Sequence, residues 1–222
     1  MLFYDRPVTI PADRAWPVGG VTKRSLDILA ASALIALLFP LMGCVAMLVL
    51  STDRGPIFYA HERVGFKGRL FRCLKFRSMR VNSAVILEQY LAGNSSARLE
   101  WERDQKLRSD PRVTTVGRFV RKWSLDELPQ LFNVLAGDMS IVGPRPVTER
   151  ELSRYRSNAE FYLSSRPGIT GLWQVSGRNN LSYDTRVALD ALYVKSWSLL
   201  LDGKLLLKTF GVVLGGEKSG SF

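Results

Sequence analysis

The chain has 222 residues, with 31 lysines and arginines against 20 aspartates and glutamates, so its formal net charge at pH 7 is +11. A surface this basic suits anionic lipid head groups or phosphorylated substrates. Nucleic acid is the rival partner, but the chain carries no helix-turn-helix, zinc-finger or RNA-binding motif, so we expect no nucleic-acid binding. Two isolated cysteines (Cys44 and Cys73) and one histidine (His61) argue against a zinc site and a Ser-His-Asp triad.

Residues 1–20 predict a flexible amino-terminal tail, because prolines and glycines punctuate them. Residues 21–53 predict a membrane helix, because Ile28–Thr52 carries no charge over 25 residues and a bilayer needs about 20. This segment is too long for the apolar part of a secretory signal, and no small-residue cleavage site follows it. A buried core helix suits so small a domain less well.

Pro40 divides the apolar segment into two halves of 12 residues. Proline bends or breaks a helix, and each half is about 18 Å long, which reaches only partway through a hydrocarbon core of about 30 Å. Both flanks are basic, whereas a spanning helix has its excess of positive charge on one side. A re-entrant helix that enters, bends at Pro40 and returns fits this pattern, and a single kinked span is an equal alternative. The basic flanks are Lys23, Arg24, Arg54, Arg63, Lys67, Arg69 and Arg72.

Residues 54–222 predict one cytosolic, membrane-associated catalytic domain of the α+β class, mainly helical. A short β-hairpin is expected over 56–76, where two runs rich in aromatic and branched residues flank a glycine-containing turn. The leucine-rich segment Leu199–Leu214, with lysines four residues apart, predicts a helix that lies in the membrane interface or packs into the core. Further helices, two of them clearly amphipathic, are expected at 82–92, 96–107, 114–123 and 185–196.

Asp126 and Glu127 are adjacent carboxylates in the segment Ser124-Leu125-Asp126-Glu127-Leu128-Pro129. Ser124 and Glu127 have the spacing of a capping box, which predicts both carboxylates at the start of a helix. Pro129 fits this frame less well, and a start one or two residues away is the alternative. Capping alone would explain them. Adjacent carboxylates also suit phosphate chemistry, because one can attack phosphorus while the other holds a divalent cation on the phosphates.

A diphosphate substrate needs cations that screen its charge from an approaching carboxylate. The planar fork of arginine matches phosphate oxygens, and the prolines on both sides of Arg145 fix its backbone. Most basic residues of such a chain are solvated, so each one alone is a weak candidate. The candidates are Lys75, Arg77, Arg112, Arg121 and Arg145.

A series of short motifs extends over nearly the whole chain, from Lys23 to about Phe210. They are Lys75-Phe76-Arg77-Ser78-Met79, Asp110-Pro111-Arg112-Val113-Thr114, the acidic segment above with Gln130-Leu131, Gly143-Pro144-Arg145-Pro146, Arg166-Pro167-Gly168-Ile169-Thr170-Gly171, Gly177-Arg178-Asn179 and Trp197-Ser198-Leu199. In this order they resemble the bacterial sugar transferases, the monotopic polyprenyl-phosphate phosphoglycosyl transferases of the exopolysaccharide type.

The resemblance implies a re-entrant helix with its bend at Pro40, although Phe39 stands where the family often has serine. It implies that Asp126 is the nucleophile and that Glu127 is the ligand of a magnesium ion (Mg²⁺). It also adds Arg178 to the residues that bind the substrate phosphate or nucleotide.

The implied reaction moves a hexose 1-phosphate, with glucose or galactose favoured, from a UDP-sugar to undecaprenyl phosphate. UMP leaves, and a phosphosugar-aspartate is the intermediate. This would be the first membrane step of exopolysaccharide synthesis, at the cytoplasmic face of the bacterial inner membrane. The implied partners are the UDP-sugar, undecaprenyl phosphate, membrane phospholipids and a second copy of the chain in a homodimer.

Two other functions remain open from the sequence. One is a non-enzymatic basic adaptor that binds anionic lipids. The other is a glycosyltransferase that acts in one displacement and releases UDP rather than UMP.

Overall fold

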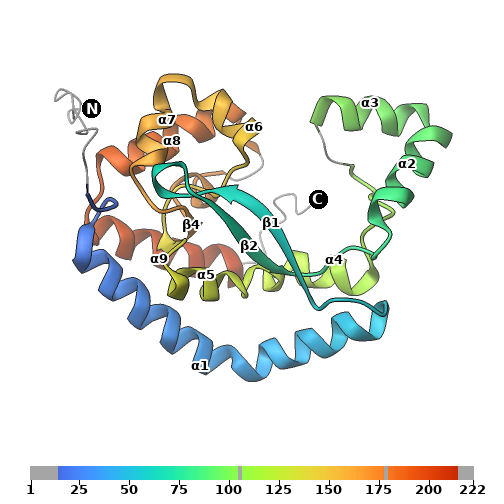
Figure 1. The fold of residues 1–222 in the computed structure, drawn as a ribbon, viewed down its shortest axis with the longest axis horizontal. Coiled ribbons are helices and arrows are strands. Elements are labelled where there is room, and N and C mark those ends of the chain that lie inside the picture. Colours follow the sequence, from blue (N-terminus) through green and yellow to red (C-terminus); the bar gives the residue numbers. More distant parts are fainter. Residues whose placement is uncertain (1–14, 105–106, 178–179, 215–222) are drawn as a thin grey trace.

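The protein is described by a computed structural model over residues 15–104, 107–177 and 180–214. Figure 1 shows one long helix, α1 (Gly20–Thr52), which curves along a domain built from short helices and two small sheets. The expected fold, mainly helical with a short hairpin, is confirmed. Most of the expected tail, residues 1–14, lies outside the described residues, and Val18 near its end is buried against the domain.

Helix α1 continues through Pro40, and Figure 1 shows a bend between its two halves. Within the described part of the chain, it is the one helix whose length and apolar composition suit a membrane crossing. One side of α1 packs on the domain and the other is exposed and apolar. The exposed side includes Leu29, Leu37, Phe39, Leu41, Met47 and Leu48.

The amino-terminal turns of α1 are held in the domain by buried polar contacts. Lys23 Nζ donates to Asp202 Oδ2 at 2.5 Å. Asp202 also accepts hydrogen bonds from Tyr193 Oη at 2.7 Å and from Trp197 Nε1 at 3.1 Å. The lysine charge therefore meets a carboxylate that three donors satisfy, which is the condition for burying an ion pair at little cost.

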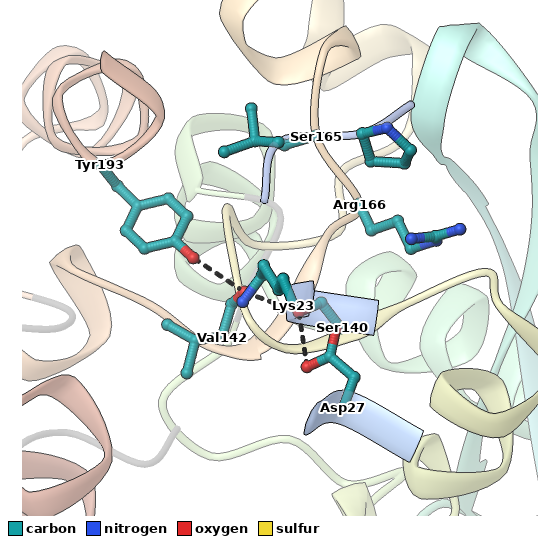
Figure 2. Close-up of a pocket in the computed structure, with 9 residues that line it drawn as sticks. Lys23, Asp27, Ser140, Val142, Ser165, Arg166 and Tyr193 are labelled. Carbon is teal, nitrogen blue, oxygen red and sulfur yellow. Dashed lines mark hydrogen bonds between the residues drawn. The ribbon is translucent and has the colours of Figure 1, made fainter. Parts of the chain in front are cut away.

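Two further residues attach the same end of α1. Arg24 donates to the last carbonyl groups of helix α5 (Gln130–Ala136), where a helix favours a cation. Asp27 accepts from Ser140 Oγ at 2.9 Å and from Ile141 N at 3.0 Å. Figure 2 shows Asp27 directed toward Ser140 and Tyr193 directed toward Val142 at a small pocket, whose lining includes neither Asp126 nor Glu127.

The carboxyl-terminal end of α1 is attached to the same domain. Arg77 Nη2 donates to Asp53 O at 2.6 Å, and Val81 N donates to Asp53 Oδ2 at 2.8 Å. The last turns of the helix also contribute to an apolar cluster that comprises Met42, Val45, Val49, Phe76 and Val120.

Strands β1 (Phe58–Val64) and β2 (Leu70–Phe76) form the antiparallel hairpin that the sequence predicts. A second sheet, the parallel pair β3 (Ser140–Val142) and β4 (Gly168–Thr170), was not predicted. Each of these strands has three residues, which is too short to show an alternating pattern.

The predicted helices are all present, with ends shifted by at most three residues. Their bounds are α2 (Ser83–Gly93), α3 (Ser95–Asp104), α4 (Thr115–Lys122), α8 (Tyr183–Lys195) and α9 (Leu199–Leu214). Two short helices were not predicted, α6 (Glu149–Leu152) and α7 (Ala159–Leu163). Helix α9 buries Leu205 in the core and exposes Leu200, Leu207 and Phe210. The expected core packing is therefore confirmed for the face that carries Leu205.

Candidate active site

The two adjacent carboxylates lie in a 3-10 turn, Leu125–Glu127, just before α5. The expected capping box at Ser124 is wrong: this residue has a left-handed backbone (φ 54°), and its side chain makes no capping hydrogen bond. The reason is Pro129, whose fixed φ suits a helix start, so α5 begins only after it. A capping box occurs instead between Thr148 and Glu151, at the start of α6.

Lys75, on β2, contacts both carboxylates. Its Nζ lies 2.7 Å from Glu127 Oε1 and 3.9 Å from Asp126 Oδ2. Asp126 is only 8% exposed. Burial raises the pKa of Asp126 to about 6, and the charge of Glu127 adds to this rise, whereas Lys75 and Arg121 oppose it. At neutral pH the Asp126 carboxyl is therefore ionised, yet poorly solvated, which suits a nucleophile.

Arg121 is brought toward Asp126 by the close approach of α4 to the chain at Ser78. A Cβ at Gly117 would lie 1.9 Å from Ser78 O, so glycine permits this approach. Thr114 caps α4 by accepting from Gly117 N at 2.8 Å, and Arg121 Nε then donates to Ser78 Oγ at 2.8 Å. Burial lowers the pKa of Arg121, whereas the charge of Asp126 raises it, so the two groups interact electrostatically.

Arg112 lies near this cluster but is already paired. Its Nε and Nη2 donate to Asp110, the shortest distance being 2.6 Å, and its guanidinium lies 4.9 Å from the ring centroid of Trp101. Although burial alone would raise it, hydrogen bonds from Arg112 hold the pKa of Asp110 below its ordinary value. The charges of Asp110 and Arg112 both act on the pKa of Arg121. The Asp110–Arg112 pair therefore lies at the margin of the site.

Arg77, a candidate for phosphate binding, lies at the end of α1. It is 8% exposed and donates to the Asp53 carbonyl. A Cβ at Gly55 would lie 2.2 Å from Arg77 Nη1, so the guanidinium fills the space beside this glycine. In this structure Arg77 holds the end of α1 against the domain.

Arg145 lies beside an aromatic ring. Its guanidinium lies 5.6 Å from the ring centroid of Trp173. Burial raises the pKa of Cys73, and the charges of Glu127 and Arg145 both act on this thiol. The structure thus groups Asp126, Glu127, Lys75 and Arg121, with Arg112 and Arg145 at the margins. Arg178 lies outside the described residues.

The acid pair fits a magnesium ion that it shares with a substrate. Within the described ranges, no three histidine, cysteine, aspartate or glutamate side chains group to hold a metal alone. Magnesium is usually held by one or two carboxylates, by water and by substrate phosphates. Burial is the main cause of the raised pKa of Asp126, and a cation beside the acid pair would favour the ionised form of this carboxyl. Glu127, adjacent and less buried, is the residue that would hold the ion.

Asn133 is a positioning residue that the sequence did not reveal. Its Nδ2 donates to Arg72 O at 2.8 Å, and its Oδ1 accepts from Leu74 N at 2.9 Å. These two bonds fix α5 to β2, and so fix the turn of the acid pair relative to Lys75. An asparagine inside a helix carries no sequence pattern that predicts such a link, whereas Ser78 and Asp110 stand inside the motifs quoted above.

The family described as bacterial sugar transferase matches residues 18–216. The chain belongs to the bacterial sugar transferase family.

Three relatives illustrate the family. The exopolysaccharide production protein ExoY of Sinorhizobium fredii is 54% identical over 197 residues, which cover 89% of this chain and 87% of that protein. The UDP-galactose-lipid carrier transferase of Erwinia amylovora is 55% identical, over 90% of this chain and 41% of that protein. The UDP-glucose:undecaprenyl-phosphate glucose-1-phosphate transferase of Klebsiella pneumoniae is 36% identical, over 87% of this chain and 41% of that protein. The chain therefore spans less than half of the last two proteins. As a sugar transferase it is an enzyme, so the adaptor alternative is excluded.

Proposed function

We propose that this sugar transferase moves a hexose 1-phosphate from a UDP-sugar to undecaprenyl phosphate and releases UMP. The observation that carries the proposal is the buried Asp126 carboxylate, 3.9 Å from Lys75 and adjacent to Glu127. The names of the relatives agree with a sugar-phosphate transfer, one from UDP-galactose and one from UDP-glucose. In this proposal the enzyme starts exopolysaccharide synthesis, with glucose or galactose as the favoured sugar.

Asp126 is the proposed nucleophile. One of its oxygens forms a bond to the sugar-proximal phosphorus while the bond to the oxygen of UMP breaks. The resulting phosphosugar-aspartate is then attacked by the phosphate of the lipid, which forms the diphosphate and frees the carboxylate. A covalent intermediate replaces one difficult step between two anions by two easier ones.

The cations around Asp126 supply electrostatic stabilisation. Lys75 and Arg121 are close enough to lower the pKa of Asp126, and the same charges stabilise the phosphate oxygens that gather negative charge during transfer. A magnesium ion on Glu127 would further screen the diphosphate. Arg145, Arg112 and Arg178 are proposed to contact the outer parts of the substrate. In this proposal Arg77 does not bind the substrate but holds the end of α1 in place through its hydrogen bond to Asp53 O.

The attachment of both ends of α1 to one domain supports the re-entrant topology. A straight helix of 33 residues would be about 50 Å long and would carry one end across the bilayer. Here Lys23 and Asp53, at opposite ends, both contact the catalytic domain. In this proposal the domain lies at the cytoplasmic face of the inner membrane, with α1 bent at Pro40 inside one leaflet. The exposed leucines of α9 would contact the phospholipids, and homodimerisation stays a prediction.

The nucleotide that leaves the donor tests the proposal. Purified enzyme with undecaprenyl phosphate and UDP-glucose or UDP-galactose should release UMP and form lipid-linked sugar phosphate in equal amounts. Release of UDP would identify a direct glycosyl transfer. The absence of both nucleotides with a panel of UDP-sugars would refute the proposed donor class.

A further inference from the structure

Tyr59 lies directly across the hairpin from Lys75. Side chains of residues paired in antiparallel strands point to the same face of a sheet. Because Lys75 contacts Glu127, Tyr59 stands on the face that borders the acid pair. Its side chain contributes little to the core, since the residue is 53% exposed.

His61, two residues farther along β1, supports the Tyr59 ring. Their ring centroids are 6.1 Å apart with an interplanar angle of 22°, so the two rings are stacked. The neighbouring Phe58 differs, because it points to the opposite face and stacks on the buried Phe76. Stacking on the buried Phe76 therefore accounts for Phe58, which is itself 47% exposed. The ring of Tyr59 instead stacks on the half-buried His61 and lies exposed on the face of Lys75.

We propose that Tyr59, supported by His61, stacks on the uracil ring of the nucleotide donor. This inference rests on the proposed function, which supplies the UDP-sugar. A cation beside an exposed aromatic ring fits a planar base joined to a phosphate: Lys75 binds the phosphate, and Tyr59 offers its π face to the base. The UMP part of the donor then lies along β1, from Lys75 toward Tyr59.

The base is a better occupant than the sugar. The relatives named above act on UDP-galactose and on UDP-glucose, so uridine is the part that their donors share. Every nucleobase presents two flat π faces, whereas the hydroxyl groups of a hexose need polar partners. The Tyr59 ring is exposed, and its stacking on His61 helps to fix its orientation.

Inhibition by UMP and by ribose 5-phosphate isolates the contribution of the base. Formation of lipid-linked sugar phosphate is measured while either compound is added. In Tyr59→Leu, the UMP concentration that halves the rate should rise roughly tenfold, since one stacked base is lost. Inhibition by ribose 5-phosphate, which lacks the base, should not change. Tyr59→Phe keeps the ring and should retain the wild-type value.

The matched control is Leu70→Ala, an exposed apolar residue on the opposite face of the same hairpin. It should leave both inhibitions unchanged. Tyr59→Gln, a polar replacement at an exposed position, is a second variant that removes the ring. It should weaken inhibition by UMP as Tyr59→Leu does.

Unchanged inhibition by UMP in both Tyr59→Leu and Tyr59→Gln would overturn the inference. So would a change in the preference between UDP-glucose and UDP-galactose with UMP inhibition unaltered, because the ring would then contact the sugar. A wild-type enzyme that neither forms the lipid product nor responds to UMP would refute the proposed function itself.

Discussion

Lys23 Nζ and Asp202 Oδ2 lie 2.5 Å apart in the protein interior, although 179 residues separate them in the sequence. The pair joins the start of α1 to the start of α9. These are the two helices with the most exposed apolar surface, and one ion pair thus fixes their relative position. We infer that it orients the membrane-facing surface as a single unit.

Lys23→Met tests this role. The variant leaves the Asp202 charge buried with two neutral donors, Tyr193 and Trp197, and should lower the free energy of unfolding by about 3–5 kcal/mol. Lys204→Met, on the exposed side of α9, is the matched control and should change it by less than about 0.5 kcal/mol. Thermal unfolding in detergent or nanodiscs measures both, and equal stabilities would show that the buried pair contributes nothing.

The re-entrant topology predicts that both ends of α1 face the cytoplasm. In a Cys44→Ser background, single cysteines at Trp16 and Glu62 should resist a membrane-impermeant thiol reagent in intact cells. Both should react after lysis, since both positions are exposed on the protein surface. Labelling of the Trp16 position alone in intact cells would establish a spanning helix.

Glu127→Gln should reduce turnover by roughly 100-fold or more, because the diphosphate would lose the ligand of its screening cation. Chelation of magnesium should have a similar effect on the wild-type enzyme. Glu62→Gln, exposed on the opposite face of β1, should remain active. Full activity in excess chelator would remove magnesium from the proposal.

Much of this fold was predictable because its signals are local. The uncharged run Ile28–Thr52, the turn between two strand-like runs and the helical periodicities each depend on neighbouring residues. The parallel pair β3–β4 was not predictable, since it joins two segments of only three residues. The glycines beside these strands are needed because the two backbones approach closely, and that approach exists only in the folded chain. A Cβ at Gly143 would lie 2.5 Å from Arg166 O, and no local pattern encodes that distance.

The candidate site shows the same division. Its acid pair was visible in the sequence, whereas the different places of Arg77 and Arg121 were not. Both are arginines in basic segments, yet one contacts the Asp53 carbonyl and the other contacts Ser78 beside Asp126. The difference arises from the packing of α4 at Gly117, a long-range contact.

The raised pKa of Asp126 predicts a stability that depends on pH. Folding raises the pKa of this carboxyl from its ordinary value of 3.8 to about 6. Between these two pH values the unfolded state loses its proton first, so the free energy of unfolding falls as the pH rises. Asp126→Asn removes this charge. The variant should match the wild type near pH 4 and exceed it above pH 6 by on the order of 2–3 kcal/mol. Thermal unfolding with chelator at several pH values measures the difference, and a constant difference would contradict the raised pKa.

The same substitution tests the nucleophile. Asparagine has nearly the size of aspartate, but it lacks the anion that attacks phosphorus, so Asp126→Asn should abolish UMP release while the protein stays folded. Wild-type enzyme given a UDP-sugar without lipid should gain the mass of one sugar phosphate on the peptide that contains Asp126. Undecaprenyl phosphate should then remove it. Because the variant should be more stable than the wild type above pH 6, unfolding cannot account for its inactivity there. An adduct on another residue, or turnover by the variant at a comparable rate, would reject covalent catalysis at Asp126 and favour a direct displacement.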